Sequence, residues 1–572
     1  MLALISGYIS NYFQDRGFGF ITTDDGKQVF FHRNSVEGDK NVIQRGIVVN
    51  FEIEHQADGK ARASTVRLTD KKRRFEKHRP RKTKRLKPYS GDTLNLEDSK
   101  RAKALREIAQ WKVEAKLEDI KRYFYRVPEL DDILSGHASY VIGRKGTGKT
   151  ALVEYLSEQA SSDILTTKLT FKNFPFNELY GQTNDAYTRP NQYITIWKLI
   201  IYSAICRKIA DDPGCDPLIK RTIDKAFPPV ESDNLGTIVE KWISGEFGLT
   251  VLGTGGRLGG LTKKKSPATL QNKVENLEAF VKKHSPKKTI LVMFDELDED
   301  YKEIFETFQK SNYLDLLTSL FKAVQDVKAN FKGQDSSPQP IIFLRDDIYD
   351  LLQDPDKNKW TDLEVHIKWN HREIKELIAL RLSRVMDSDE QDFDKLWYSI
   401  FTRKPLEYSN SNKHITCFDY LNLSAQGRPR DYISYLKECA SIERRRSNRE
   451  IDTDTVKDAD KQFSNYLRKE LRDEVHGILP EIDKIFAIFS ELRKWILKVD
   501  EFKEAYEERV EAGLIKNRDI DFVLRTLFYF SIIGNVARVG VHIFRHEKPS
   551  SQLNFKENIV VHRGLMKSLQ IL

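Results

Sequence analysis

The feature that most constrains this chain is a glycine-rich loop set between an apolar strand and a helix. Residues 138–150 read ASYVIGRKGTGKT, and ALVEYLSEQ follows directly. The spacing Gly143-x-x-x-x-Gly148-Lys149-Thr150 is that of a Walker A motif. Backbone N–H groups in such a loop point inward at phosphate oxygens, and the following helix adds the positive end of its dipole. We therefore expect a central α/β domain with this loop at the carboxyl end of a strand.

The loop residues have separate expected roles. Lys149 can reach the β- and γ-phosphates of ATP, and the Thr150 hydroxyl can hold Mg²⁺. A fortuitous glycine-rich turn is the alternative, and the strand–loop–helix context argues against it. The residues expected to bind the nucleotide are Gly143, Gly146, Gly148, Lys149, Thr150 and Ala151.

A second strand is expected to bring acidic groups to the same site. Residues 289–296 read TILVMFDE, a continuous apolar run of the kind buried in parallel sheets. Asp295 would reach Mg²⁺ through water, and Glu296 would polarise the attacking water. The alternative is a strand followed by a solvated acidic run, because Asp298, Glu299 and Asp300 continue the charge.

A third strand, Pro340–Asp347, places Arg345 and Asp346 at its carboxyl end, where open α/β sheets present ligand groups. A structural ion pair is an equally good interpretation of Arg345. Further on, 370–385 reads as a helix and 424–440 as a turn that enters another helix. Within the turn, Pro429 fixes the helix start, so Arg430 lies in the first turn.

Together, the features between about 120 and 450 resemble bacterial STAND and AAA+-like P-loop ATPases. The resemblance implies ATP and Mg²⁺ as ligands, a helical lid, and Arg430 as a lid arginine that contacts the γ-phosphate; an exposed arginine is the alternative. With Lys149, Asp295 and Glu296, Arg430 completes the expected catalytic set. Such ATPases often occur in stress-response and antiphage systems.

The first seventy residues predict a small all-β module. Short strand-like runs alternate with turns, including Asp25-Gly26, a strong hairpin signal. The segments GFGFI (Gly17–Ile21) and VFFH (Val29–His32) carry aromatic rings on which flat bases can stack. An OB barrel kept only for protein contacts, with its phenylalanines partly in the core, is the alternative.

These paired motifs resemble those of a cold-shock domain, a five-stranded OB barrel, over residues 5–68. The resemblance implies binding of single-stranded RNA or DNA, with Phe18, Phe20, Phe30 and His32 as stacking platforms. The tryptophan usual in the first strand of the family is absent, and Tyr12 is the nearest aromatic residue; Arg33 stands where another aromatic is common.

The chain's positive charge is concentrated in one place. Residues 71–87 hold eleven basic residues and one acid, a net charge of +10, and the whole chain carries +9, so the remainder carries −1. This distribution argues against a uniformly cationic binder. A solvated linker, an arm that contacts phosphates beside the barrel and a nuclear-localisation segment are the possible interpretations, and the first two are compatible.

The remaining regions carry weaker signals. A single helix is expected from Leu96 to about Phe124, docked on the ATPase. Gly245–Gly260 is expected to form a flexible hairpin, and contact with nucleic acid or a neighbour is the alternative. Residues 519–572 read as a helix, short strands and a final apolar helix, an order similar to a winged-helix module and suited to partner or self contact more than to DNA. The apolar segment Tyr193–Cys206 is too short to span a membrane and predicts a buried helix.

The expected organisation is multidomain, with an N-terminal all-β OB barrel, a central α/β P-loop NTPase with a helical lid, and a C-terminal winged-helix-like module. The expected ranges are 1–70 for the barrel, 71–95 for a disordered basic linker, 96–385 for the ATPase, 386–460 for the lid and 461–572 for the C-terminal region. Four irregularly spaced cysteines and no signal peptide predict a cytoplasmic protein.

Two functions fit this organisation. The first is an ATPase that senses or remodels single-stranded nucleic acid. The second is a nucleotide-gated scaffold that binds ATP without hydrolysing it and recruits a separate effector, since the sequence contains no nuclease or protease constellation. Neither involves a membrane, and both allow a homo-oligomer or a separate effector protein as partner. A translocating motor is disfavoured because further helicase motifs are missing.

Overall fold

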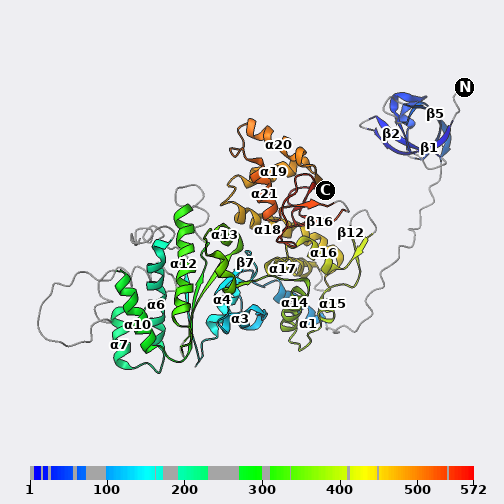
Figure 1. Cartoon of the computed structure of the whole chain (residues 1–572). Helices are drawn as coiled ribbons and strands as arrows, with labels where there is room; N and C mark the ends of the chain where they lie inside the picture. Colours follow the sequence, from blue (N-terminus) through cyan, green and yellow to red (C-terminus); the bar gives the residue numbers. More distant parts are fainter. Residues whose placement is uncertain are drawn as a thin grey trace, which may run out of the picture. The chain divides into compact units, whose positions relative to one another are not determined.

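The structure is a computed structural model, and it describes residues 5–14, 17–23, 28–44, 46–55, 61–72, 98–161, 163–171, 191–229, 270–298, 310–334, 337–408, 413–446, 450–537 and 540–571. It divides into two compact units, Met1–Leu86 and Lys87–Leu572 (Figure 1). Several predicted features lie outside the described residues: the turn at 24–27, the basic arm after Lys72, the glycine-rich stretch 245–260, and the acids Glu299 and Asp300.

The N-terminal unit is a closed all-β barrel, as predicted. Its strands are β1 (Ile5–Phe13), β2 (Phe18–Thr23), β3 (Gln28–His32), β4 (Val36–Glu37), β5 (Ile47–His55) and β6 (Ala61–Lys72). They follow the order β3-β2-β1-β5-β6-β4, and a pairing of β3 with β6 closes the sheet. Alternate side chains such as Ile9, Ile21, Phe31 and Phe51 fill the interior.

A β-bulge decides which aromatic residues of β1 face outward. The pairing of β1 with β2 shifts between Ile9 and Asn11, so that Tyr12 lies opposite Gly19 and Phe13 opposite Phe18. An extra residue in one strand reverses the faces of every residue beyond it. Tyr12 therefore packs against the core and stacks on the buried ring of Phe31, with centroids 6.0 Å apart.

The larger unit is built on a five-stranded parallel sheet. The strands are β7 (Tyr140–Gly143), β8 (Ile164–Thr170), β9 (Thr289–Asp295), β10 (Ser337–Arg345) and β11 (Glu364–His366), in the order β11-β7-β10-β9-β8. All four strand pairings are parallel. The phosphate-loop strand β7 and the acidic strand β9 are therefore separated by β10, and all three end at the same edge.

Helices cover both faces of this sheet (Figure 1). On one face Tyr140 and Ile142 of β7 belong to a core shared with α6, α10 and α12, while on the other Val141 packs with α3 and α4. Alternation along each strand buries both of its sides. The helices are α3 (Glu129–Leu134), α4 (Lys149–Glu158), α6 (Ile194–Asp211), α7 (Pro217–Ala226), α10 (Leu270–His284), α12 (Lys310–Asn330) and α13 (Asp346–Leu351).

The apolar segment 193–206 lies in α6, whose side chains are almost all buried, as expected for a core helix. None of the helices in the described ranges combines the length and the hydropathy needed to span a membrane.

A helical region follows the sheet and shares one core with α1 and with the C-terminal region; we call its helices α14 to α18 the lid, a wider range than the expected 386–460. Its helices are α14 (His371–Val385), α15 (Phe393–Ile400), α16 (Cys417–Ser424), α17 (Pro429–Arg446) and α18 (Thr453–Val475). A short hairpin of β12 (Leu406–Tyr408) and β13 (Lys413–Ile415) joins α15 to α16. The N-terminal helix α1 (Asp98–Ile108) packs into this core through Ala104, Leu105 and Ile108, so it docks on the lid.

The expected single helix from Leu96 to Phe124 is wrong. The helix ends at Ile108, and the chain continues through an irregular segment with the 3₁₀ turn η4 (Ala115–Leu117) to the short helix α2 (Ile120–Tyr123). Asp119 caps α2 by accepting a hydrogen bond from the Arg122 N–H. Residues 112–118 are called the strap below, because they run along the edge of the central cavity.

The C-terminal region contains three helices and a small antiparallel sheet. Its elements are α19 (Ile482–Leu492), β14 (Ile496–Leu497), α20 (Val499–Glu511), α21 (Ile520–Tyr529), β15 (Ile533–Val536), β16 (His542–Ile543) and β17 (Asn558–Val561). The strand order is β14-β17-β15-β16. The expected final apolar helix is not formed in the described residues, since the chain ends in the 3₁₀ turn η8 (Arg563–Leu565) and further turns.

Candidate nucleotide-binding site and nucleic-acid interface

The glycine-rich loop connects β7 to α4 as predicted. Gly146 and Gly148 have φ angles of 83° and 101°, in the left-handed region that favours glycine. Gly148 is the N-cap of α4, which begins at Lys149 and continues through Thr150 and Ala151. A Cβ atom on Gly143 would lie 2.7 Å from the Thr147 hydroxyl oxygen, so the loop is folded tightly on itself.

Lys149 is folded across its own loop. Its Nζ donates to the carbonyl oxygens of Gly143 at 2.7 Å and of Arg144 at 3.1 Å. Burial lowers the pKa of the Lys149 ammonium, and the nearby carboxylates of Asp298 and Asp346 oppose this effect. Phosphate oxygens entering the loop would exchange with these two carbonyl acceptors.

Asp295 ends β9 beside the phosphate loop, and one of its carboxylate oxygens lacks a hydrogen-bond partner in the described part of the chain. Burial, followed by the charge of Glu296, raises the pKa of Asp295 to about 6. Its Oδ2 atom is buried and has no hydrogen-bond partner among the described residues. A buried carboxylate oxygen without a partner is what a bound cation would satisfy. The Thr150 hydroxyl lines the same cavity and supplies the second expected oxygen.

Glu296 follows at once and is already engaged. Its backbone has a φ of 59°, uncommon for a residue with a side chain. One carboxylate oxygen, Oε1, lies 2.5 Å from Nζ of Lys116 in the strap, while Oε2 is buried without a hydrogen-bond partner in the described part of the chain.

Arg345 forms the structural ion pair that the sequence left open. Its guanidinium donates to both carboxylate oxygens of Asp347, at 2.9 and 2.6 Å, and to Asp298 at 3.3 Å. Burial alone would raise the pKa of Asp298, but the charges of Arg345 and Lys149 hold it below its ordinary value. Arg345 thus ties the ends of β9 and β10 together.

The two arginines of the Gly427–Arg430 turn differ in their surroundings. Arg428 is fully buried and pairs with Asp431 at 3.0 Å and Glu474 at 2.6 Å, so it is a structural residue of the lid. Arg430 lines the cavity and pairs with Glu470 at 3.2 Å and Glu114 at 3.3 Å. A Cβ on Gly146 would lie 3.2 Å from Cβ of Arg430, which places the lid against the phosphate loop.

A further network joins the phosphate loop to the C-terminal region. Arg144 donates to the Gln426 side-chain oxygen at 2.7 Å and to its backbone carbonyl at 3.3 Å. The Gln426 amide donates in turn to the carbonyls of Ser531 at 3.0 Å and Phe530 at 3.4 Å. Arg144, which lies between Gly143 and Gly148 of the loop, is therefore linked through Gln426 to the segment after α21.

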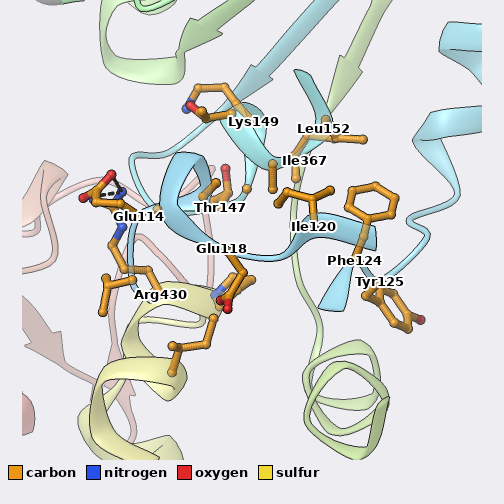
Figure 2. Close-up of a pocket in the computed structure, with 18 of the residues that line it drawn as sticks. Glu114, Glu118, Ile120, Phe124, Tyr125, Thr147, Lys149, Leu152, Ile367 and Arg430 are labelled. Carbon is orange, nitrogen blue, oxygen red and sulfur yellow. Dashed lines mark hydrogen bonds and ion pairs between the residues drawn. The ribbon is translucent and has the colours of Figure 1, made fainter. Parts of the chain in front are cut away.

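These groups surround a cavity of about 320 Å³ (Figure 2). One wall is polar, formed by the phosphate loop, Asp295 and Glu296, and the opposite wall is apolar. The apolar wall includes Ile120, Phe124, Leu152, Ile367 and Trp369. Trp369 also donates from its indole N–H to the Thr147 carbonyl at 2.8 Å. A polar end beside an apolar wall suits a ligand with phosphates and a planar base.

Sequence reasoning missed the strap and the residues after β11 in this cavity. For Ile367 and Trp369 a signal existed, because they follow an apolar strand at the edge where the other ligand groups gather. For the strap, the cap residue Asp119 marks a new helix start, but the apolar spacing before it resembles a continuing helix.

The barrel presents a cluster of aromatic side chains on its outer surface, called the aromatic face. Phe18 contacts the rings of Phe13, Phe20 and Phe30 at centroid distances of 5.2, 6.3 and 5.6 Å. His32 lies opposite Phe18 in the pairing of β2 with β3. The structure brings together four of the five predicted residues; Tyr12 lies on the core side because of the bulge. Phe13, which was not predicted, takes the outward position and is 45% exposed.

Two parts of the chain match known protein families. Residues 5–69 match the 'cold-shock' DNA-binding domain, which confirms that the N-terminal unit is a cold-shock domain. Residues 372–472 match a FunZ-associated C-terminal helical domain, which covers the lid helices.

The described residues contain no group of three or more His, Cys, Asp or Glu side chains placed to hold a metal ion.

More distant similarities extend over most of the chain. A transposon gamma-delta protein of 80.3 kDa from Escherichia coli (strain K12) is 23% identical over 452 residues, which are 74% of this chain and 61% of that protein. The chain thus spans less than two thirds of this relative's length. Among solved structures, the Aeropyrum pernix ORC1 protein in complex with DNA has a TM-score of 0.30 and 13% identity, covering 85% of this chain and 94% of the other. Cdc6p from Pyrobaculum aerophilum has a TM-score of 0.27 and 12% identity, covering 83% and 96%.

Proposed function

We propose that this protein is an ATPase that binds single-stranded nucleic acid and couples that binding to its nucleotide cycle. The observation that carries the proposal is the convergence of three sequence-distant elements on one cavity. The phosphate loop with Lys149, the end of β9 with Asp295 and Glu296, and the lid turn with Arg430 all line it. A nucleotide with its phosphates against the loop fits the polar wall and the apolar wall together.

Each residue of the cavity has a role in this proposal. Backbone N–H groups around Gly146 and Gly148 and the Lys149 ammonium would bind the phosphates. Thr150 and Asp295 would hold Mg²⁺ with phosphate oxygens completing its shell. This role is supported by the buried Oδ2 of Asp295, which has no hydrogen-bond partner in the described part of the chain. Such an ion neutralises charge on the phosphates. Glu296 would orient and polarise the attacking water, and Arg430 would stabilise the charge on the transferred phosphoryl group.

The aromatic face would supply the nucleic-acid site. Every base can stack on an aromatic ring, whatever the sequence of the strand. Single strands of RNA or DNA therefore suit the rings of Phe18, Phe20, Phe30 and His32. The basic segment 71–87 follows the barrel in the chain, and its charge of +10 adds affinity for phosphates that does not depend on sequence. Tethering both to one ATPase raises the local concentration of strand near it.

The C-terminal region would act as a winged-helix-like contact module. The succession α19, β14, α20, α21 and then strands β15 and β17 matches the order of such a module. Helix α21 is engaged within the chain, since the Tyr529 hydroxyl donates to Asp350 at 2.6 Å and Arg545 pairs with the same carboxylate at 3.1 Å. We therefore favour contact with a partner protein or a second copy over reading of a DNA groove.

The coupling is tested by phosphate release from the full chain in the presence and absence of single-stranded RNA and DNA. Stimulation or inhibition that is lost when Phe18 and Phe30 are both replaced by alanine supports coupling through the aromatic face. Strand binding that is sensitive to salt but leaves turnover unchanged contradicts it.

A second candidate is a nucleotide-gated scaffold that holds ATP and recruits a separate effector. It is favoured by the contacts that the site residues already make. Lys116 forms an ion pair with Glu296, and the Lys149 ammonium donates hydrogen bonds to two backbone carbonyls. Single-turnover measurements on the wild-type chain and on Glu296→Gln separate the two. An ATPase releases phosphate and loses that release in the variant, whereas a scaffold retains intact ATP in both.

A further inference from the structure

The strap is the one segment of the described chain whose ion pairs reach both the lid and the acidic end of β9. It enters from α1, which packs on the lid, and leaves into α2. Five of its residues line the cavity, and Figure 2 shows Glu114 and Glu118 beside the phosphate loop and Arg430. It is therefore placed to respond to movement of the lid.

Each charged contact of the strap involves a different functional or structural group. Lys116 pairs with Glu296 at 2.5 Å, Glu114 pairs with Arg430 at 3.3 Å, and Glu118 pairs with the buried Arg381 of α14 at 2.6 Å. Arg381 also lies over the rings of Trp111 and Tyr123, at 4.6 and 4.5 Å from their centroids. The last set anchors both ends of the strap to the lid.

Lys116 and Glu114 therefore occupy the two side chains that hydrolysis would need. A carboxylate that contacts an ammonium at 2.5 Å has one oxygen less for orienting a water molecule, and the other oxygen of Glu296 is buried without a hydrogen-bond partner among the residues that the structure describes. An arginine paired with two carboxylates, Glu114 and Glu470, must exchange at least one of them to reach a phosphate.

We propose that the strap is a built-in restraint on hydrolysis, in which Lys116 holds Glu296 and Glu114 holds Arg430 until a nucleotide shifts the lid relative to the sheet. The inference rests on the proposed function and adds its regulation. The Arg430 guanidinium leaves Glu114 when its side chain turns towards the phosphates. Because Glu118 keeps the strap on the lid, a shift of the lid relative to the sheet separates Lys116 from Glu296, which stays on the sheet.

The test compares full-length variants. Lys116→Met should raise kcat for ATP about three- to fivefold, the range expected for loss of one partly exposed ion pair, and leave the affinity for ATP within about twofold. Lys116→Arg, which keeps the charge, should behave like the wild type. Lys103→Met is the matched control: it removes the ion pair of Lys103 with Asp387 at 3.0 Å, on the exposed surface of α1, and should leave kcat unchanged.

A second measurement follows the strap itself. The backbone N–H groups of Leu117 and Glu118 donate to the carbonyls of Glu114 and Ala115 at 3.0 and 3.1 Å. Their hydrogen exchange should become faster when a non-hydrolysable ATP analogue binds the wild-type chain. In Lys116→Met it should be faster without any nucleotide.

Unchanged or reduced kcat in Lys116→Met, or slower exchange of these amides with the analogue, overturns the restraint. The proposed function fails in a different way, by turnover that survives Lys149→Ala. If Lys149→Ala abolishes turnover while Lys116→Met matches the wild type, only the strap inference is lost.

Discussion

The aromatic face and the nucleotide cavity differ in how their groups are engaged. On the barrel, rings contact one another but keep outward surfaces open, so a base adds contacts without breaking any. In the cavity, Lys149, Glu296 and Arg430 each already have protein partners. A ligand there exchanges contacts. The first site is therefore suited to capture and the second to switching, since only exchange changes the protein's own interactions.

Replacement of Lys149 should give the largest separation between the two sites. Lys149→Ala removes the cation proposed to contact the phosphates, and we expect phosphate release to fall about 10²- to 10³-fold, as for loss of one transition-state donor. Affinity for single strands should stay within about twofold because the aromatic face lies in the other unit. Phosphate-release and strand-binding assays on the same preparation check both. Residual turnover near the wild-type level would falsify the site assignment.

Asp295→Asn should stabilise the protein while it removes the proposed Mg²⁺ ligand. A pKa raised from 3.8 to about 6 corresponds to about 3 kcal/mol against ionisation in the folded state. Without Mg²⁺ and with EDTA, we expect the variant to gain about 2–3 kcal/mol of unfolding free energy at pH 7.5, measured by urea denaturation.

The pH dependence of that gain tests its cause. Asp295 has a raised folded-state pKa, so the wild-type chain loses stability as pH rises from the unfolded-state value towards about 6. The gain from asparagine should be complete above pH 6, about half at pH 5.0, and absent below pH 3.8. A gain that does not change with pH points to packing instead of charge.

Phe18→Ala tests whether the aromatic face is the capture site. Loss of one stacking platform should weaken binding of single strands by about 1–3 kcal/mol, measured by fluorescence anisotropy at fixed salt. Tyr12→Leu is the matched control, because it removes a neighbouring ring that faces the core. We expect it to lower the thermal stability of the barrel without changing affinity. Equal losses in both variants would contradict the assignment of faces.

Phe13→Ala should give the smallest effect. Phe13 lies at the end of β1 and its ring contacts that of Phe18, whereas Phe18 contacts three rings. We expect a loss near the lower end of the stacking range, about 1 kcal/mol or less. A loss as large as that of Phe18→Ala would extend the face across the first strand.

The sequence predicted those parts of the fold that depend on the residue pattern within one short segment. The buried strands β7 and β9 are continuous apolar runs, and their carboxyl ends carry Lys149, Asp295 and Glu296, so the site followed from spacing and sheet geometry. The barrel followed from alternating aromatic residues and turns.

Features set by one extra residue or by distant partners were not predictable in this way. The bulge after Ile9 reverses the faces of Tyr12 and Phe13, and no local pattern marks it. The helical spacing of Leu105, Ile108 and Trp111 continues past the true helix end, where contacts of the strap with Arg381, Arg430 and Glu296 decide the backbone instead.

The network around Arg144 makes the larger unit less divisible than its chain order implies. Sequence patterns leave positions 144 and 145 of the loop unspecified, yet Arg144 binds Gln426, whose amide is satisfied by the carbonyls of Phe530 and Ser531. A chain cut after Val475 would remove the two carbonyl acceptors of the Gln426 amide, and it would expose the apolar side chains of the lid that pack against the C-terminal region. Gene fragments that end after the lid would therefore encode a phosphate loop that lacks one of its supports, and exchange of this C-terminal region between relatives would require Arg144 and Gln426 to be exchanged with it.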